Sequence, residues 1–170
     1  GDAITSSRTV FTNAAVTVKS IQFDNDDTYA IAGGGSVNLE ADAGNASITV
    51  LQGSHEFQTV VNLVTNTGGG VAATSSLLFN NALNLGGLTL TKTGAGAMNI
   101  NNQLNTGGGS VLISAGALGG SGEIIGDLSN IGGTLAPGNS PGVMTIDGDY
   151  TQGTEGTLLI ELSGTEAHDL

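Results

Sequence analysis

Two groups of carboxylates are the residues of this sequence whose types and spacing could do chemistry. Asp24, Asp26 and Asp27 stand together in FDNDD, and Asp147 and Asp149 alternate in IDGDY. Oxygen clusters of this kind can bind calcium or supply the acid and base of glycoside cleavage. Neither stretch completes the D-x-D-x-D-G pattern of a calcium loop. We therefore expect solvated turns at both places, with weak structural calcium binding as the alternative and no catalysis.

The two histidines do not complete a catalytic set. His55 follows Ser54 directly before an apolar run, and His168 lies close to the C-terminus. A nucleophilic triad needs a carboxylate that orients the imidazole, and nothing in the sequence specifies one. We expect His55 in a turn before a strand, no catalytic residue, no cofactor site and therefore no enzymatic activity.

Composition limits the classes of partner. The 170 residues carry a net charge of −12, and only Arg8, Lys19 and Lys92 oppose 15 carboxylates. Binding to nucleic acid requires clustered cations, so nucleic acid is excluded as a partner. There is no cysteine for a disulfide or a thiolate metal site, and no apolar run is long enough to span a membrane as a helix. An acidic, lysine-poor surface is typical of proteins outside the cell.

Short apolar runs interrupted by glycine predict an all-β chain with very little helix. The runs are β-branched and alternate with Thr, Ser or Asn, as in Ala15–Phe23 and Glu56–Val64, which we expect to be single strands. Glycine contributes 29 residues, and its clusters predict turns that need positive φ. These clusters are Gly33–Gly35, Gly68–Gly70, Gly86–Gly87, Gly107–Gly109, Gly119–Gly120 and Gly132–Gly133.

The similarity of these units favours a β-solenoid over a sandwich or a barrel. No segment could serve as a crossover helix, and Asn-Gly or Asp-Gly hairpin turns are nearly absent. A unit of this size cannot bury its own apolar face and must stack on copies of itself. We expect one domain over residues 1–170, a parallel β-helix of seven or eight rungs.

Asparagines beside the strands have two possible roles. Stacked amides can hydrogen-bond from rung to rung, or the residues can simply occupy turns. The group comprises Asn80, Asn81, Asn84, Asn99, Asn101, Asn102 and Asn105.

The segment from Leu88 to Gln152 resembles a known family. LTLTKTGAGAMNI, followed by GGGSVLISAGALGGSGEIIGDL and GGTLAPGNSPGVMTIDGDYTQ, is similar to the autotransporter-associated β-strand repeat, also called the passenger-associated transport repeat. The earlier stretches SIQFDNDDTYAIAGGGSVNLE and SITVLQGSHEFQTVVNL resemble coils of autotransporter-like and PEP-CTERM-sorted proteins. The resemblance implies a right-handed parallel β-helix in a non-catalytic protein that is secreted or displayed on the bacterial cell surface.

These observations predict a structural function. Both ends of a β-helix expose unpaired backbone groups, and the sequence shows no amphipathic capping helix, so we expect head-to-tail self-association. The product would be a filament, a biofilm matrix or an adhesive surface rod. The alternatives are a β-helix that binds or cleaves polysaccharide, and an inert stalk belonging to a larger autotransporter passenger.

Overall fold

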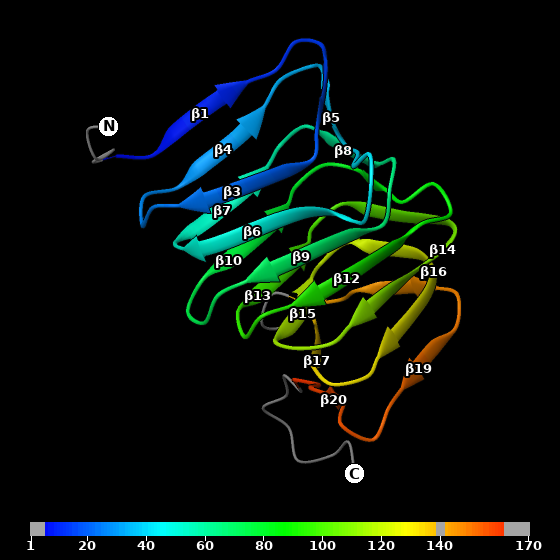
Figure 1. Ribbon diagram of the computed structural model, residues 1–170. Coiled ribbons are helices and arrows are strands. Elements are labelled where there is room, and N and C mark those ends of the chain that lie inside the picture. The colour runs from blue at the N-terminus through cyan, green and yellow to red at the C-terminus, as the bar shows by residue number, and fades with distance from the viewer. Residues whose placement is uncertain (1–5, 139–141, 162–170) are drawn as a thin grey trace.

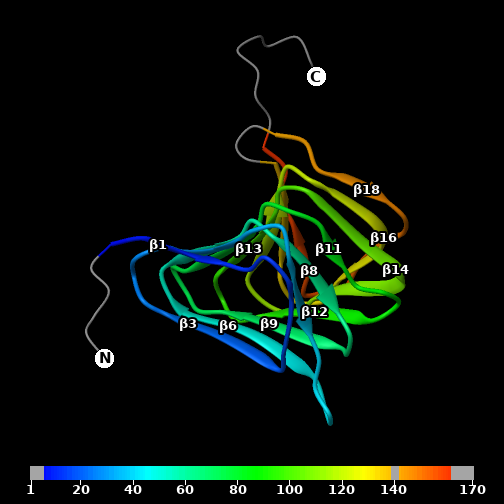
Figure 2. The same cartoon turned by 90° about the horizontal axis from the view of Figure 1, so that it is seen from above.

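The chain forms a β-solenoid of three parallel faces. The computed structural model describes residues 6–138 and 142–161, and within these ranges every regular element is a strand (Figure 1). The chain visits faces 1, 2 and 3 in turn, and one such circuit is called a coil. Seven coils follow one another, and a single strand on face 1 follows the seventh. Seen from the N-terminal end, the chain runs clockwise as it recedes, so the solenoid is right-handed (Figure 2). The expected parallel β-helix is confirmed.

Face 1 is an eight-stranded parallel sheet. Its strands, in order, are β1 (Arg8–Phe11), β4 (Tyr29–Ala32), β7 (Ser54–Phe57), β10 (Ser76–Phe79), β13 (Ala97–Ile100), β15 (Ala117–Gly120), β17 (Thr134–Pro137) and β20 (Thr157–Leu158).

Faces 2 and 3 are joined into one 12-stranded sheet, because β14 (Gln103–Ile113) and β16 (Glu123–Asn130) each bend from one face onto the other. Face 2 also contains β2 (Ala15–Val18), β5 (Ser36–Leu39), β8 (Val60–Leu63), β11 (Leu83–Asn84) and β18 (Thr145–Asp147). Face 3 also contains β3 (Ser20–Asp24), β6 (Ala46–Gln52), β9 (Thr67–Val71), β12 (Thr89–Thr93) and β19 (Tyr150–Gln152).

Alternation of apolar and polar residues places one side of each strand in the core. Register aligns these inward residues from coil to coil, so that Leu83, Leu104 and Ile124 form one continuous column. Phe57 and Phe79 are fully buried on successive coils, and their stacked rings have centroids 5.2 Å apart. Because each inward residue contacts its equivalents above and below, the core is a stack of aliphatic layers.

Two expected strands are divided by corners of the solenoid. Ala15–Phe23 forms β2 and β3 with Lys19 between them, and Glu56–Val64 is divided after Phe57. The prediction of single strands was wrong because local alternation continues through a corner. The position of the corner depends on how many residues each face can hold. Pairing with the strands of the neighbouring coils sets that number.

The expectation of turns at every glycine cluster was also wrong. Gly68, Gly69 and Gly70 lie within β9, and none of them has a positive φ. Gly69 faces the core, where an added Cβ would collide with the end of the Met98 side chain, which belongs to β13, the first strand of the coil after next. Glycine is used here for close packing of a neighbour rather than for a turn.

Candidate interaction surfaces

The two carboxylate groups lie at opposite ends of the solenoid. Asp24 ends β3, and Asp26 and Asp27 belong to the turn that leads from the first coil to the second, whereas Asp147 and Asp149 belong to the seventh coil. Among the described residues, no three or more His, Asp or Glu side chains converge as metal ligands would. The structure therefore does not bring the two sequence-predicted groups into one site.

The turn after β3 is held by local hydrogen bonding. The Asp27 N–H donates to the Asn25 side-chain oxygen at 2.7 Å, which is the pattern of an Asx turn. Asp24 and Asp26 are exposed to solvent.

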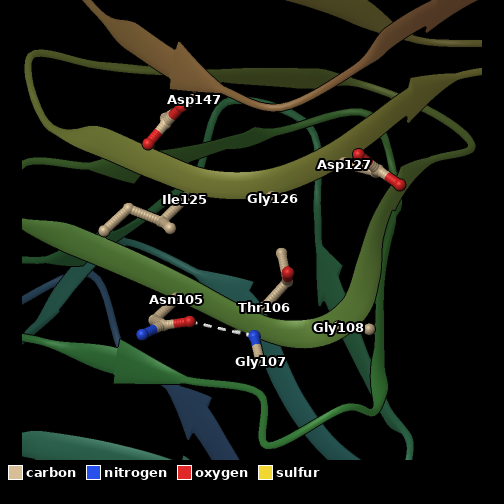
Figure 3. Close-up of a pocket in the computed structure, with 9 residues that line it drawn as sticks. Asn105, Thr106, Gly107, Gly108, Ile125, Gly126, Asp127 and Asp147 are labelled. Atoms are coloured by element: carbon tan, nitrogen blue, oxygen red, sulfur yellow. Dashed lines mark hydrogen bonds between the residues drawn. The ribbon is translucent and has the colours of Figure 1, made fainter.

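A shallow polar hollow lies where faces 2 and 3 meet near the C-terminal end (Figure 3). Asn105 pairs with Ile125 and Ser110 with Asp127, so the four intervening residues of β14 stand opposite Gly126 alone. This bulge leaves a space of about 230 Å³. It is lined by Asn105, Thr106, Gly107, Gly108, Gly109, Ile125, Gly126, Asp127 and Asp147.

The charge of this hollow is entirely negative. Asp127 and Asp147 are exposed and lie on either side of Gly126 in Figure 3. One Asp127 oxygen accepts a hydrogen bond of 3.0 Å from the Asp149 N–H of the next coil. The Asn105 oxygen accepts from the Gly107 N–H at 2.9 Å. The hollow can offer carboxylate and amide groups to a polar ligand.

The N-terminal mouth of the solenoid is open and apolar in the described part of the chain. Residues of the first two coils surround two hollows of about 360 and 240 Å³. The larger is lined by Val10, Gln22, Phe23, Asp24, Tyr29 and Ile31. The smaller is lined by Val10, Phe11, Thr12, Val16, Val18, Ile21, Ile31 and Val37. In the middle coils the corresponding positions are filled by the next layer of side chains.

His55 has a structural position rather than the turn position expected from the sequence. It lies within β7, is fully buried and stacks on Phe23 with ring centroids 4.6 Å apart. Its Nδ1 accepts from the Tyr29 N–H at 3.0 Å, so Nε2 carries the proton and donates to the Gln52 carbonyl at 2.9 Å. Both ring nitrogens are thus used to hold adjacent coils. The even spacing of His55 and Phe57 was the signal that it faces inward. His168 lies outside the described residues.

Lys92 is a buried cation that sequence reasoning treated only as part of the net charge. Its side chain is fully buried on face 3, and burial lowers its pKa to about 8. The Nζ donates to three backbone carbonyls, those of Thr93 and Gly94 at 2.8 Å and that of Ala115 at 3.0 Å. The exposed cations of the described residues are therefore Arg8 and Lys19.

Asparagines form a ladder on the outside of face 2. The Asn62 amide donates to the Asn38 oxygen and the Asn84 amide donates to the Asn62 oxygen, both at 2.9 Å. On the neighbouring edge of face 1, Asn101 donates to Asn80 at 2.7 Å. Asn81 instead uses its oxygen within a turn, accepting from the N–H of the next residue. Both expected roles therefore occur, and sequence reasoning missed the start of the ladder at Asn38 and Asn62.

Comparison of the chain with protein-family models, with curated protein sequences and with solved structures yields no match. The resemblance to the autotransporter-associated repeat therefore remains a prediction. Within the described ranges, no helix is long and apolar enough to cross a membrane.

Proposed function

We propose that this protein is a non-enzymatic structural rod of the bacterial cell surface or extracellular matrix, and that it self-associates end to end. The observation that carries the proposal is the state of the two ends. Among residues 6–138 and 142–161, β1, β2 and β3 each pair with a strand on one side only, and so do β18, β19 and β20 at the other end. Unpaired edges of parallel strands accept another strand of the same direction.

The backbone of β1 makes this edge specific. The N–H groups of Arg8 and Thr12 donate to Thr28 and Ala32 of the second coil. Because alternate residues of a strand point their backbone groups to opposite sides, the Thr9 N–H is directed away from β4, towards the free edge. Addition of another chain at this edge would satisfy the Thr9 and Phe11 donors.

Sedimentation velocity of the 170-residue chain over a hundredfold range of concentration tests the proposal. We expect the mean mass to rise with concentration, and negative-stain electron microscopy to show rods of constant width and variable length. A strict monomer across the range would contradict it. Thr9→Pro removes an edge donor without removing a bond to β4, so it should keep the fold and weaken association. Val10→Pro, whose N–H faces β4, is the matched variant that should destabilise the first coil.

The same edges could instead continue into further coils of one polypeptide, which is the stalk alternative. The 170-residue chain would then be monomeric when isolated. An otherwise identical chain extended by its neighbouring coils would lengthen the rod without increasing the number of chains in it. The sedimentation experiment separates these two outcomes directly.

Polysaccharide binding or cleavage is the second candidate, and the acidic hollow near Gly126 is the observation that favours it. Carboxylates and amides hydrogen-bond sugar hydroxyls, although recognition of sugars generally also uses apolar surface. Titration with an acidic polysaccharide and with a neutral one tests this candidate. Loss of binding or cleavage in Asp147→Asn, but not in Asp42→Asn on a distant turn, would support it. The same test on Asp26→Asn examines the acidic turn of the first coil.

A further inference from the structure

We propose that the partner at the N-terminal mouth is the C-terminal end of a second copy, aligned by two charged corners: Arg8 with Glu155, and Lys19 with Asp149. The inference rests on the proposed self-association and specifies its interface. Strand direction, exposed apolar surface and charge each contribute an independent argument.

Most of the large exposed apolar side chains lie at the two ends, and Leu51, Val64 and Ile131 are exposed between them. At the N-terminal end, Val10, Phe11 and Val16 are 52%, 72% and 44% exposed. At the other end, Leu158, Leu159 and Ile160 are 42%, 50% and 55% exposed. A contact between the two ends of the rod would bury these large apolar groups.

Strand direction fits a head-to-tail contact. All strand pairs between successive coils are parallel, from β1 with β4 to β17 with β20. A second copy placed with its β1 beside β20 continues this direction on face 1, and its other two faces lie in line with faces 2 and 3 of the first copy. Head-to-head contact would instead place antiparallel strands together. The contact is therefore heterologous and leaves each copy with one free end.

Charge distinguishes the two ends. Arg8 and Lys19, the exposed cations of the described residues, both belong to the first coil, which also carries the exposed Asp24 at the mouth. The last coil and the strand after it carry Asp149, Glu155 and Glu161, all exposed. The acidic turn containing Asp26 follows β3 and leads into the second coil, so it does not lie at the outermost edge. The Arg8 N–H of the outer strand β1 bonds to the Thr28 carbonyl immediately beyond that turn.

The charges also occupy matching corners. Lys19 lies between β2 and β3, and Asp149 lies between β18 and β19, so both occupy the corner between faces 2 and 3. Arg8 begins β1 on face 1, and Glu155 lies between β19 and β20, at the corner where the chain enters face 1. Stacking of β1 beside β20 with the faces in line thus brings Arg8 next to Glu155. It places Lys19 on the same corner as Asp149, two strand spacings (about 10 Å) further along the axis.

Exposed ion pairs add little affinity but determine orientation and the choice of partner. Apolar burial and strand pairing would supply most of the binding, and the corner charges would select the aligned, head-to-tail arrangement. Association should consequently weaken as ionic strength rises.

Reciprocal charge reversal tests this interface. One variant carries Arg8→Glu and Lys19→Glu, and the other carries Asp149→Lys and Glu155→Lys. We expect each alone to associate at least about tenfold more weakly than the unmodified protein, since like charges would face each other at both corners. An equimolar mixture should regain association, because every contact between the two variants restores opposite charges. Sedimentation velocity with a fluorescent label on one variant measures the mixed species, and circular dichroism checks that each variant is folded.

Glu40→Lys with Asp42→Lys is the matched control, because it makes the same change of charge at exposed positions of the second coil. Adding either charge-reversed variant to this control should not strengthen association. Association that is unaltered in both reversed variants, or a mixture no stronger than its components, would overturn the charge-matched interface while leaving self-association intact. An unmodified protein that is monomeric at every concentration would overturn self-association itself, and this interface with it.

Discussion

Lys92 and Ala115 lie on successive coils, and the Lys92 ammonium donates a hydrogen bond of 3.0 Å to the Ala115 carbonyl oxygen. Its other two bonds reach the carbonyls of Thr93 and Gly94 on its own coil. An ammonium has three protons to donate, and all three are accepted here by backbone oxygens. One buried cation therefore joins the turns from face 3 to face 1 on two adjacent coils.

Replacement of this cation should destabilise the solenoid. Lys92→Met keeps much of the side-chain volume but removes the donors that satisfy three backbone carbonyls. We expect the free energy of unfolding to fall by about 2–4 kcal/mol. Urea denaturation followed by circular dichroism measures the change. Lys19→Met, at an exposed position, is the control and should change stability by less than about 0.5 kcal/mol. Equal effects at the two positions would contradict the role assigned to Lys92.

Stability should also rise with pH in the alkaline range. The pKa of Lys92 falls from 10.5 to about 8 because of burial, so between these values the unfolded chain binds more protons than the folded one. The free energy of unfolding therefore increases as pH rises from 8 towards 10.5, and it lacks this contribution below pH 8. We expect a gain of about 1–3 kcal/mol between pH 7.5 and 10. The same titration of Lys92→Met should lose this slope; an unchanged slope would assign it to another group.

A methyl group should be poorly tolerated at Gly126. Its φ is 120°, and an added Cβ would collide with the Thr106 hydroxyl of the coil above. Gly126→Ala should therefore cost more than about 3 kcal/mol through strain and collision together. Gly34→Ala is the control, because its Cβ would meet open space. Thermal unfolding of the two variants measures the difference, and similar melting temperatures would contradict the prediction.

The asparagine ladder should contribute to cohesion between coils. Asn62→Ala removes the donor to Asn38 and the acceptor for Asn84, so we expect a loss of about 1–2 kcal/mol in the free energy of unfolding. Asn45→Ala, on an exposed turn, provides the comparison and should be close to neutral. If both substitutions are neutral in urea denaturation, the ladder is only a surface pattern.

Calcium should have little effect on the thermal stability of the rod. Calcium sites use six to eight oxygen ligands, whereas Asp24 and Asp26 are on the first coil and Asp147 and Asp149 on the seventh. We expect the melting temperature to change by less than about 1 °C between chelator and 1 mM calcium. A larger, saturable rise that disappears in Asp147→Asn would identify a calcium site near the acidic hollow.

The sequence was sufficient to predict the stacked architecture. Alternation in segments such as Ser36–Leu39 and the recurrence of glycine between short runs indicate strands that must stack on one another. These signals are local, because side chains on a strand alternate between its two sides whatever its neighbours are. The sequence also indicated correctly that asparagine amides could bond between coils, as Asn101 and Asn80 do.

Only the tertiary structure decided where each coil turns and what each inward position contacts. Ala15–Phe23 is one run in the sequence and two strands in space, because the corner at Lys19 depends on the coil stacked beneath it. Lys92 belongs to an alternating threonine run typical of a surface strand, yet it points inward, because carbonyls from two coils converge there to accept its protons. The matching of Lys19 with Asp149 is likewise invisible in one dimension. Positions 130 residues apart share a corner only because seven coils of nearly equal circumference bring them into line.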